Sequence, residues 1–434
     1  MSAGRRSWQN WARTVRVVPR RVESPASIEE LQHAVKRAAA AGEQVKAVGA
    51  GHSFTGIAAA PGVLLDLSRL QGVLEADPGR QRVRLLAGTR LHRIPGLLAR
   101  YHLAMPNLGD IDRQSVAGAI STGTHGTGAG FGGLAAQVVG LTLVQPDGGL
   151  LTLAEDDPLL PAAALSLGAL GIIADVTLQC VPAFALHAEE RSEPLAGVLG
   201  SLSARVASTD HFEFYWFPHT DRAATKANSR LPGTAPLAPL PPLGRWMDER
   251  LLSNTVFRAT CAAGAAVPAV VPAVNRVAAR LLGGRDYTDS SHRVFTQRRT
   301  VRFTEMEYGV PADRLPAAFD ALRRLIAGQG WRISFPVEVR WAAADDRWLS
   351  TAHGRDTAYI AVHRYYREDP AEYFAAVEEI LLAHAGRPHW GKLHTLDGAA
   401  LAPLYPRFGD FRKLRDELDP DRTFSNDYLD RVLE

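Results

Sequence analysis

Two glycine-rich segments limit what this chain can fold into more than any other feature of its sequence. The first, KAVGAGHSFTG, runs from Lys46 to Gly56, and the second, SVAGAISTGTHGTGAGFGG, runs from Ser115 to Gly133. Glycine permits tight turns and lets backbone N–H groups lie close to an anion. The two loops can therefore surround a diphosphate, or they can be ordinary turns in which His52 and His125 make only local hydrogen bonds.

The first segment matches neither of the common nucleotide-binding motifs. Gly49 and Gly51 supply a G-x-G, but Phe54 stands where a third glycine would complete the dinucleotide fingerprint. The full P-loop sequence, G-x-x-x-x-G-K followed by Ser or Thr, does not occur in the chain. A glycine loop that carries a histidine therefore needs another explanation.

The N-terminal half predicts an α+β domain. Ser27 to Ala41 reads as an amphipathic helix with capping-box spacing at its start, and a strand from Val45 to Val48 runs into the first glycine segment. Short strands, two glycine loops and few long helices favour an α+β domain of about 180 residues. The other elements expected in this half are strands at Val63–Leu70 and Arg82–Gly88, a short helix kinked by Pro95, and a hairpin turning at Asp147-Gly148.

The character of the sequence changes after Pro182. A proline-dense stretch from Leu231 to Gly244 has no periodicity, which is typical of a surface loop or linker. Beyond it, the strand-like segments RFTEMEYGV, ISFPVEVRWA and AYIAVHRYY alternate with helices such as DPAEYFAAVEEILLAHAG. This pattern predicts a second sheet with helices on one face.

Charge and cysteine content exclude several classes of protein. The 434 residues carry a net charge of only +3, which does not indicate a nucleic-acid or membrane-surface partner. Cys180 and Cys261 have no CxxC spacing, which excludes a disulfide scaffold and fits a reducing compartment. The most apolar stretch, from Cys261 onward, is broken by prolines and arginines. We expect a cytoplasmic protein without an integral membrane segment.

Polar residues recur with strand spacing in the second half. Glu338 and Arg340 share one face of the strand VEVRW, and His363 shares a face with Tyr365 in the same manner. In RPHWGKLH, His389 and Lys392 flank a Trp-Gly turn. Each feature can also be an ordinary solvated surface. A metal site from His389, His394 and an acid would not have the spacing of a helical ligand pair, so we predict no metal.

Taken together, these motifs resemble one family of flavoproteins. The segments VGAGHSF, SVAGAISTGTHGTG, SLGALGIIADVTL, VEVRW, RPHWGK and LDPDRTFSNDYL occur in the order found in the aldonolactone oxidoreductases of the vanillyl-alcohol-oxidase type, relatives of alditol oxidase. The resemblance covers nearly the whole chain. It implies a PCMH-type FAD domain at residues 1–182, a substrate (cap) domain at 183–404 with a mixed sheet flanked by helices, and a tail at 405–434 that returns to the FAD domain.

The resemblance also implies how FAD is held. In this family the histidine of G-x-G-H-S is joined to the 8α-methyl group of FAD, and His52 is the matching residue. A glycine loop therefore carries an imidazole in order to attach the cofactor. The positions that match FAD contacts are Val48, Gly49, Ala50, Gly51, His52, Ser53, Phe54, Gly109, Asp110, Ser115, Gly118, Thr122, Thr124, His125, Gly126, Ile173, His389 and Lys392.

The family's catalytic cluster transfers to Glu338, Arg340, His363 and Lys392. The resemblance implies that the oxidised carbon gives a hydride to flavin N5 while its hydroxyl proton leaves. Two cations would stabilise the alkoxide and the reduced flavin, each worth about 4 kcal/mol at 4 Å and an effective dielectric constant near 20. The proton acceptor stays open, because Glu338 can serve either as a base or to orient Arg340.

The expected activity is oxidation of the C2 hydroxyl of an aldono-1,4-lactone to an ascorbate-type product. The acceptor is O2 or an electron carrier, and the small residue Gly109 is a weak indication of O2. Alditol oxidase has Ala-Ser where this chain has Gly109-Asp110, which favours a lactone over a polyol. The alternatives are oxidation of an alditol such as xylitol or sorbitol, and a flavin-binding module without turnover.

Overall fold

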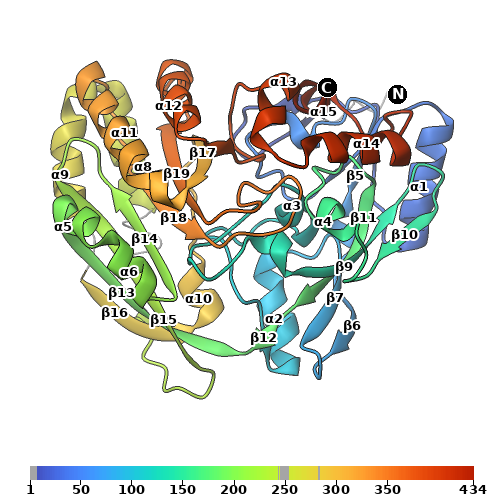
Figure 1. Cartoon of the computed structure of the whole chain (residues 1–434), viewed down its shortest axis with the longest axis horizontal. Coiled ribbons are helices and arrows are strands. Elements are labelled where there is room, and N and C mark those ends of the chain that lie inside the picture. Colours follow the sequence, from blue (N-terminus) through green and yellow to red (C-terminus); the bar gives the residue numbers. More distant parts are fainter. Residues whose placement is uncertain (1–6, 243, 245–253, 282–283) are drawn as a thin grey trace.

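The computed structural model describes residues 7–242, 244, 254–281 and 284–434. The N-terminal segment and the C-terminal helices lie together at the right of Figure 1, and the segment between them lies at the left. One large hydrophobic cluster joins buried residues between Leu31 and Cys180 to residues between Leu401 and Leu433, together with a few residues of the segment between them, such as Leu186 and Trp390. A second cluster belongs to the segment between them. The described chain therefore has two main cores.

A small parallel sheet carries the first glycine segment. Its order is β3-β5-β4, and helix α1 (Ile28–Ala40) connects β3 to β4. The Ser27 side chain accepts from the Glu30 N–H, which confirms the predicted helix start, while the Glu30 carboxylate accepts from the Ala26 N–H. The strands are β3 (Arg21–Glu23), β4 (Val45–Val48) and β5 (Val63–Asp66).

The strand predicted at Val63–Leu70 is half as long as expected. It ends at Asp66, whose side chain accepts from the Ser68 N–H at 2.9 Å and so starts a 3-10 helix, Leu67–Arg69. The kink predicted at Pro95 is also wrong. Pro95 stands in the first turn of helix α2 (Ile94–Leu98), where its missing N–H costs no hydrogen bond.

An antiparallel sheet of five strands, in the order β10-β9-β11-β7-β6, completes this half. The predicted hairpin is present between β9 and β10, and Gly148 takes a φ of +83° in its turn. The strands are β6 (Val73–Asp77), β7 (Arg82–Leu86), β9 (Val138–Val144), β10 (Leu150–Leu153) and β11 (Ile172–Gln179).

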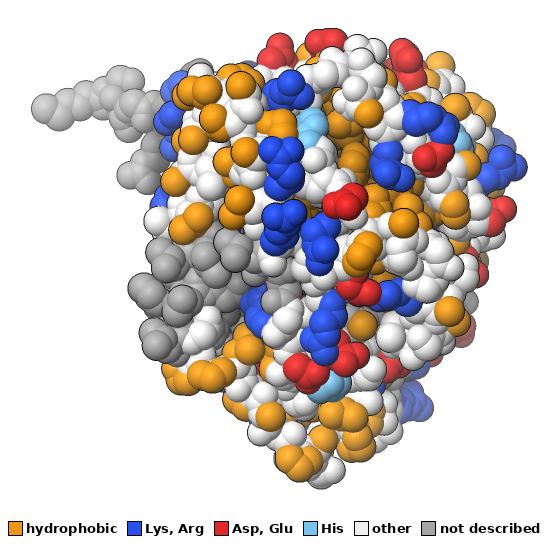
Figure 2. Space-filling view, turned by 90° about the vertical axis from the view of Figure 1, so that its left-hand side faces the viewer, with side chains coloured by type: hydrophobic (Ala, Val, Ile, Leu, Met, Phe, Trp, Pro, Cys, Tyr) orange, Lys and Arg blue, Asp and Glu red, His pale blue; other side chains and the backbone are white. Residues whose placement is uncertain are grey.

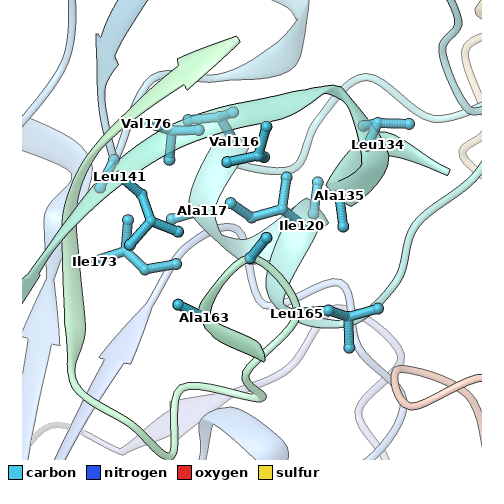
Figure 3. Packing of buried hydrophobic residues seen from close by; sticks show 14 of the residues in the cluster. Val116, Ala117, Ile120, Leu134, Ala135, Leu141, Ala163, Leu165, Ile173 and Val176 are labelled. Atoms are coloured by element: carbon cyan, nitrogen blue, oxygen red, sulfur yellow. The ribbon is translucent and has the colours of Figure 1, made fainter. Parts of the chain in front are cut away.

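Helix α3 (Val116–Ser121), inside the second glycine segment, packs directly on this sheet. Figure 3 shows its residues Val116, Ala117 and Ile120 beside Leu141 of β9 and Ile173 and Val176 of β11. These side chains are apolar and buried in the first core. The buried contact fixes the position of α3, and with it the second glycine segment.

The second core lies on one face of an eight-stranded sheet. Its order is β16-β13-β15-β14-β18-β19-β17-β20, and each described pairing within it is antiparallel, which refines the predicted mixed sheet. The strands are β13 (Phe184–Pro194), β14 (His211–Trp216), β15 (Arg222–Pro232), β16 (Arg285–Ser290), β17 (Phe303–Pro311), β18 (Val337–Ala342), β19 (Thr357–Tyr365) and β20 (Arg387–Pro388).

Helices cover both faces of this sheet, not one face as predicted. Apolar residues of α5, α6, α11 and α12 pack in the second core, whereas Phe257 and Cys261 of α8 pack against Phe303 and Tyr365 on the opposite face. The alanine- and glycine-rich sequence of α8 permits this close approach. The helices are α5 (Leu195–Gly200), α6 (Leu202–Ser208), α8 (Phe257–Ala266), α9 (Val271–Leu281), α10 (Ser291–Phe295), α11 (Leu315–Gln329) and α12 (Ala371–Ala383).

The C-terminal segment packs against the first glycine segment. The Val45 N–H donates to the Thr423 carbonyl at 2.7 Å, and the buried Lys46 ammonium donates to the Phe424 carbonyl at 3.0 Å. The Asn426 amide donates to the carbonyls of Gly56, Ile57 and Ala59. The helices here are α13 (Gly398–Leu401), α14 (Phe408–Leu418) and α15 (Asp427–Leu433).

The remaining described elements are short. None of the helices in the described part of the chain has the length and hydropathy needed to cross a bilayer. On the face in Figure 2, Lys and Arg side chains run down the middle with Asp and Glu side chains beside them. The remaining short helices and strands are β1 (Trp8–Gln9), β2 (Arg16–Val17), β8 (Leu103–Ala104), β12 (Val181–Pro182) and α4 (Leu160–Ala163).

Candidate active site

A narrow groove follows the end of strand β4. It has a volume of about 100 Å³ and is lined by the first glycine segment, by α3 and by the start of β11. A Cβ added at Gly49 would overlap the Ser115 Oγ, and Gly51 takes a φ of +66°, so both positions require glycine. The predicted residues in its lining are Val48, Gly49, Ala50, Gly51, His52, Ser53, Ser115, Gly118, Thr122 and Ile173.

A wide chamber of about 620 Å³ opens from the same place. The groove and the chamber share His52, Ser53, Gln114 and Thr122, so the two cavities meet at the histidine of the first segment. The predicted residues in the chamber lining are Phe54, Gly109, Asp110, Thr124, His125, Glu338, Arg340, His363, His389 and Lys392. Of the predicted set, Gly126 is in neither lining; an added Cβ there would overlap the Leu108 carbonyl oxygen, so it shapes the loop.

His52 is held as a neutral ring at the junction. Its ring stacks against Trp11 with 5.7 Å between centroids, and the Trp11 N–H donates to the Gly51 carbonyl at 2.7 Å. Burial, with help from the charges of Arg90 and Lys392, lowers the pKa of His52 to about 4. The ring therefore keeps a free lone pair near neutral pH, which is the form able to act as a nucleophile.

One face of the eight-stranded sheet supplies the chamber's polar side chains. In the register of the strands, Tyr215 of β14 lies opposite Glu338 of β18, and His363 of β19 lies opposite Glu305 of β17. Val337, Val339 and Phe214 point to the other face and are buried in the second core. Strand alternation thus produces the predicted polar face of VEVRW, and the face is enclosed in a cavity.

Arg340 lies at the centre of one cluster of charges. Its guanidinium is ion-paired with Glu338, donates to Glu213 at 2.9 Å and to the Tyr215 hydroxyl at 3.3 Å, and lies 3.9 Å from Asp110. These carboxylates hold the pKa of Arg340 well above its ordinary value, although burial opposes them. The arginine is therefore a fixed cation.

The carboxylates around Arg340 differ from one another. Burial raises the pKa of Asp110, but Arg299 and Arg340 outweigh it and the pKa is lowered; both Nε and Nη2 of Arg299 donate to Asp110, at 3.0 and 2.9 Å. Burial also raises the pKa of Glu338, and here Arg340 does not fully compensate because Glu213 and Asp110 are close. Glu338 therefore takes a proton more readily than Asp110 does.

Lys392 belongs to a second cluster of charges in the chamber lining. Its ammonium donates to Glu305, whose carboxylate also lies 3.5 Å from His363 Nε2. Burial raises the pKa of Glu305, but Lys392 and His363 outweigh burial, so the pKa is lowered. Burial would lower the pKa of Lys392, and Glu305 and Glu307 raise it above the ordinary value. The pair is therefore ionised at neutral pH.

His125, Glu307 and His389 lie close enough together to resemble a metal site. The hydrogen bonds point to another arrangement. His125 Nδ1 lies 2.9 Å from the Gly126 carbonyl and its Nε2 lies 3.3 Å from Glu307, so both nitrogens face oxygen acceptors. His389 Nδ1 accepts from the Gly391 N–H, which leaves the proton on Nε2. These contacts already engage His125 and His389 Nδ1 within the protein. His394, the other histidine considered for a metal, pairs with the Tyr428 hydroxyl instead.

The structure adds residues that the sequence reasoning did not assign. Glu305 and Glu307 stand on one face of RFTEMEYGV while Met306 and Tyr308 are buried on the other. Alternation in that segment could have identified the pair. Glu213 and Tyr215 alternate in the same way in HFEFYWFP. Arg299 follows no such pattern, and only the fold brings it to Asp110.

Comparison with known proteins now adds to this geometry. Residues 176–432 match the model of the D-arabinono-1,4-lactone oxidase family, and residues 19–154 match that of an FAD binding domain. This chain belongs to the D-arabinono-1,4-lactone oxidase family. It is therefore an FAD-dependent oxidoreductase. The groove fits FAD, because its glycine positions clear space for a diphosphate at the edge of the chamber.

Several named relatives match nearly the full length of this chain. An L-gulono-1,4-lactone dehydrogenase from Mycobacterium tuberculosis is 43% identical, with 98% of this chain and 99% of that protein covered. An L-gulonolactone oxidase from Scyliorhinus torazame is 33% identical, and an alditol oxidase from a Streptomyces species is 32% identical; each match covers 98% of both chains.

The fold is shared with a more distant flavoprotein. The crystal structure of cholesterol oxidase from B. sterolicum matches with a TM-score of 0.82 at 19% identity, covering 99% of this chain and 96% of that one. At this identity the likeness concerns the fold alone. It agrees with the predicted PCMH-type FAD domain joined to a second domain with a sheet and helices.

Proposed function

We propose that this enzyme oxidises the C2 hydroxyl of an aldono-1,4-lactone, of the L-gulono, L-galactono or D-arabinono type, to an ascorbate-type product. The observation that carries the proposal is the chamber, whose lining joins the His52 junction to two ion-paired and largely enclosed cations, Arg340 of β18 and Lys392 of the segment after β20. The names of the relatives support a lactone as the substrate.

The chamber's side chains suit this chemistry. FAD, when bound, supplies the hydride acceptor. Arg340 and Lys392 bind the reacting hydroxyl and stabilise the negative charge that develops on its oxygen. We assign the hydroxyl proton to Glu338, because Glu338 has the raised pKa whereas Asp110, Glu305 and Glu307 have lowered ones. His363 lies on the same face and orders the substrate side of the chamber.

We propose that His52 carries a covalent bond to FAD. Its neutral ring and its place where groove and chamber meet support this assignment. The groove residues would hold the diphosphate, and the segment from Gly109 to Gly126 would line the flavin. Flavin colour that stays with the precipitated protein in acid would support the covalent bond, and colour released into the supernatant would contradict it.

We also propose the division into an FAD domain at residues 1–182, a cap domain at 183–404 and a returning tail at 405–434. The shared first core and the matched ranges 19–154 and 176–432 support it. The two buried free cysteines support the proposed cytoplasmic location. The relatives include a dehydrogenase and oxidases, so the acceptor is O2 or an electron carrier.

The substrate is tested by anaerobic stopped-flow reduction of the bound flavin. We expect L-gulono-1,4-lactone to reduce it faster than xylitol or sorbitol at equal concentration. Faster reduction by a polyol would favour the alternative of an alditol oxidase, which the Streptomyces relative supports. If neither the lactone nor the polyols reduced the flavin, both proposed activities would be overturned. Mixing the reduced enzyme with O2 or with an electron carrier then identifies the acceptor.

A further inference from the structure

Glu305 is the buried carboxylate that links Lys392 to the neighbouring strand. It stands on β17 directly opposite His363 of β19, and its side chain is 7% exposed. Lys392 Nζ donates to its Oε2, and His363 Nε2 lies 3.5 Å from its Oε1. Its backbone carbonyl accepts from the Leu393 N–H at 2.9 Å, so both its backbone and its side chain hold the segment that carries Lys392.

The two cations of the chamber are held in different ways. Arg340 contacts three carboxylates and a tyrosine hydroxyl, and its planar guanidinium fixes its direction. Lys392 has a compact charge on a flexible stem. In the described part of the chain, Glu305 is the carboxylate that forms an ion pair with it, while the Phe54 ring lies beside its ammonium at 5.3 Å. Removing Glu305 would therefore leave Lys392 without a fixed direction.

We propose that Glu305 is a positioning residue that aims the Lys392 ammonium at the reacting hydroxyl and keeps it charged. This inference rests on the proposed function, in which Lys392 binds that hydroxyl. Glu305 acts through Lys392 and does not itself receive the proton.

The electrostatics of Lys392 give the direction of the effect. Burial lowers its pKa, and Glu305 is the largest of the groups that raise it. Without the Glu305 charge, the ammonium would lose its proton at a lower pH, because burial would no longer be offset to the same extent. The titratable groups that face this part of the chamber are Glu305 and Glu307 of β17, Glu338 of β18, His363 of β19, and His52 and His389 on the adjoining segments.

The test uses Glu305→Gln in the FAD-loaded enzyme, with Glu305→Asp to restore the charge. The pH dependence of Lys392 acylation by acetic anhydride, followed by peptide mass spectrometry, reports the protonation of Lys392 without relying on turnover. We expect the midpoint to fall by about 1–3 pH units in Glu305→Gln, the usual effect of a neighbouring opposite charge. It should return toward wild type in Glu305→Asp. Glu213→Gln, which removes a partner of Arg340, should leave the Lys392 midpoint in place.

Flavin reduction by the lactone gives a second readout. In Glu305→Gln, the loss of rate at high pH should begin at a lower pH than in wild type, and the maximum rate should fall more than the substrate KM rises. An unchanged Lys392 midpoint together with an unchanged rate profile would overturn the inference. If Lys392→Met reduced its flavin at the wild-type rate, the proposed role of Lys392 would fail first, so the two failures are distinguishable.

Discussion

The groove and the chamber are built by different means. The groove is lined mainly by three short segments, residues 46–58, 114–122 and 167–173, and its key positions are Gly49 and Gly51. The chamber is lined by charged and polar side chains of the eight-stranded sheet and by apolar side chains of helices α8 and α9. A site made of backbone is set by local conformation, whereas a site made of charges depends on which strands are paired. The two regions should therefore respond differently to mutation.

The largest expected effect is in the chamber. Lys392→Met keeps most of the side chain's length and removes its charge, so flavin reduction by L-gulono-1,4-lactone should slow by about two to four powers of ten, or about 3–5 kcal/mol. FAD content and the unfolding midpoint should change little. Stopped-flow absorbance measures the rate. Lys413→Met, which removes an exposed lysine of α14, is the matched control and should reduce its flavin at the wild-type rate.

Slow flavin reduction in Lys392→Met, together with a wild-type rate in Lys413→Met, would show that Lys392 acts in the chamber and is not a solvated surface charge. Equal rates in the two variants would leave only Glu338 and Arg340 as candidates for the charged site. Arg340 would then be the cation of the chamber that acts in the reaction, without Lys392.

At His52, where the groove and the chamber meet, the expected effect is on the covalent attachment of FAD. His52→Ala should abolish covalent flavin, because the alanine has no nucleophile, while the fold stays intact. Mass spectrometry of the denatured protein measures the bound mass. His125→Ala is the comparison variant and should keep its covalent flavin. Flavin retained by denatured His52→Ala protein would instead point to His125 as the attachment site.

In the groove, the expected effect is on stability and FAD content. The Cβ of Gly49→Ala would overlap the Ser115 Oγ, which caps α3 by accepting from the Gly118 N–H at 3.2 Å. Losing this cap should cost about 1 kcal/mol of unfolding free energy and lower the bound FAD. Denaturant unfolding and the flavin absorbance of the purified protein are the measurements.

Gly96→Ala is the control for this prediction. Gly96 lies in helix α2 with nothing within 4 Å of an added Cβ, so alanine should be neutral or slightly stabilising there. If Gly49→Ala were as stable and as rich in FAD as Gly96→Ala, the groove would not depend on glycine.

The last expected effect is on reoxidation, beside the flavin segment. A Cβ at Gly109 would lie 3.0 Å from the His125 carbonyl oxygen and 3.3 Å from Thr124 Cγ2, so the loop must shift by a few tenths of an ångström. If Gly109 leaves room for O2, Gly109→Ala should slow reoxidation by O2 about tenfold, or about 1.4 kcal/mol. Reduction by the lactone should change less. Equal reoxidation rates in the two proteins would show that O2 does not pass this residue.

Local signals in the sequence predicted single elements of the fold. Helix α1, strand β4 and the turn at Gly148 follow from local signals, namely a cap, a periodicity and a turn residue. The face shared by Glu338 and Arg340 also follows from alternation within one strand.

The partners of these residues could not be derived in this way. Glu305 reaches Lys392, and Glu213 reaches Arg340, only because strands far apart in the chain pair in one register. Alternation within RFTEMEYGV shows that Glu305 and Glu307 share a face, but not which residues they meet. The family resemblance predicted the candidate site residues, and the fold shows which side chains lie next to them.

The packing of the C-terminal segment on strand β4 bears on how the protein is made. Lys46 and Phe424, which are hydrogen-bonded, are separated by 378 positions in the chain. At typical rates of synthesis, roughly 20–80 s pass on the ribosome between these two residues. During that time, the strand that leads into the first glycine segment lacks the partners for Val45 and Lys46. The first glycine segment of a nascent chain therefore gains this support only after Thr423 and Phe424 have been made.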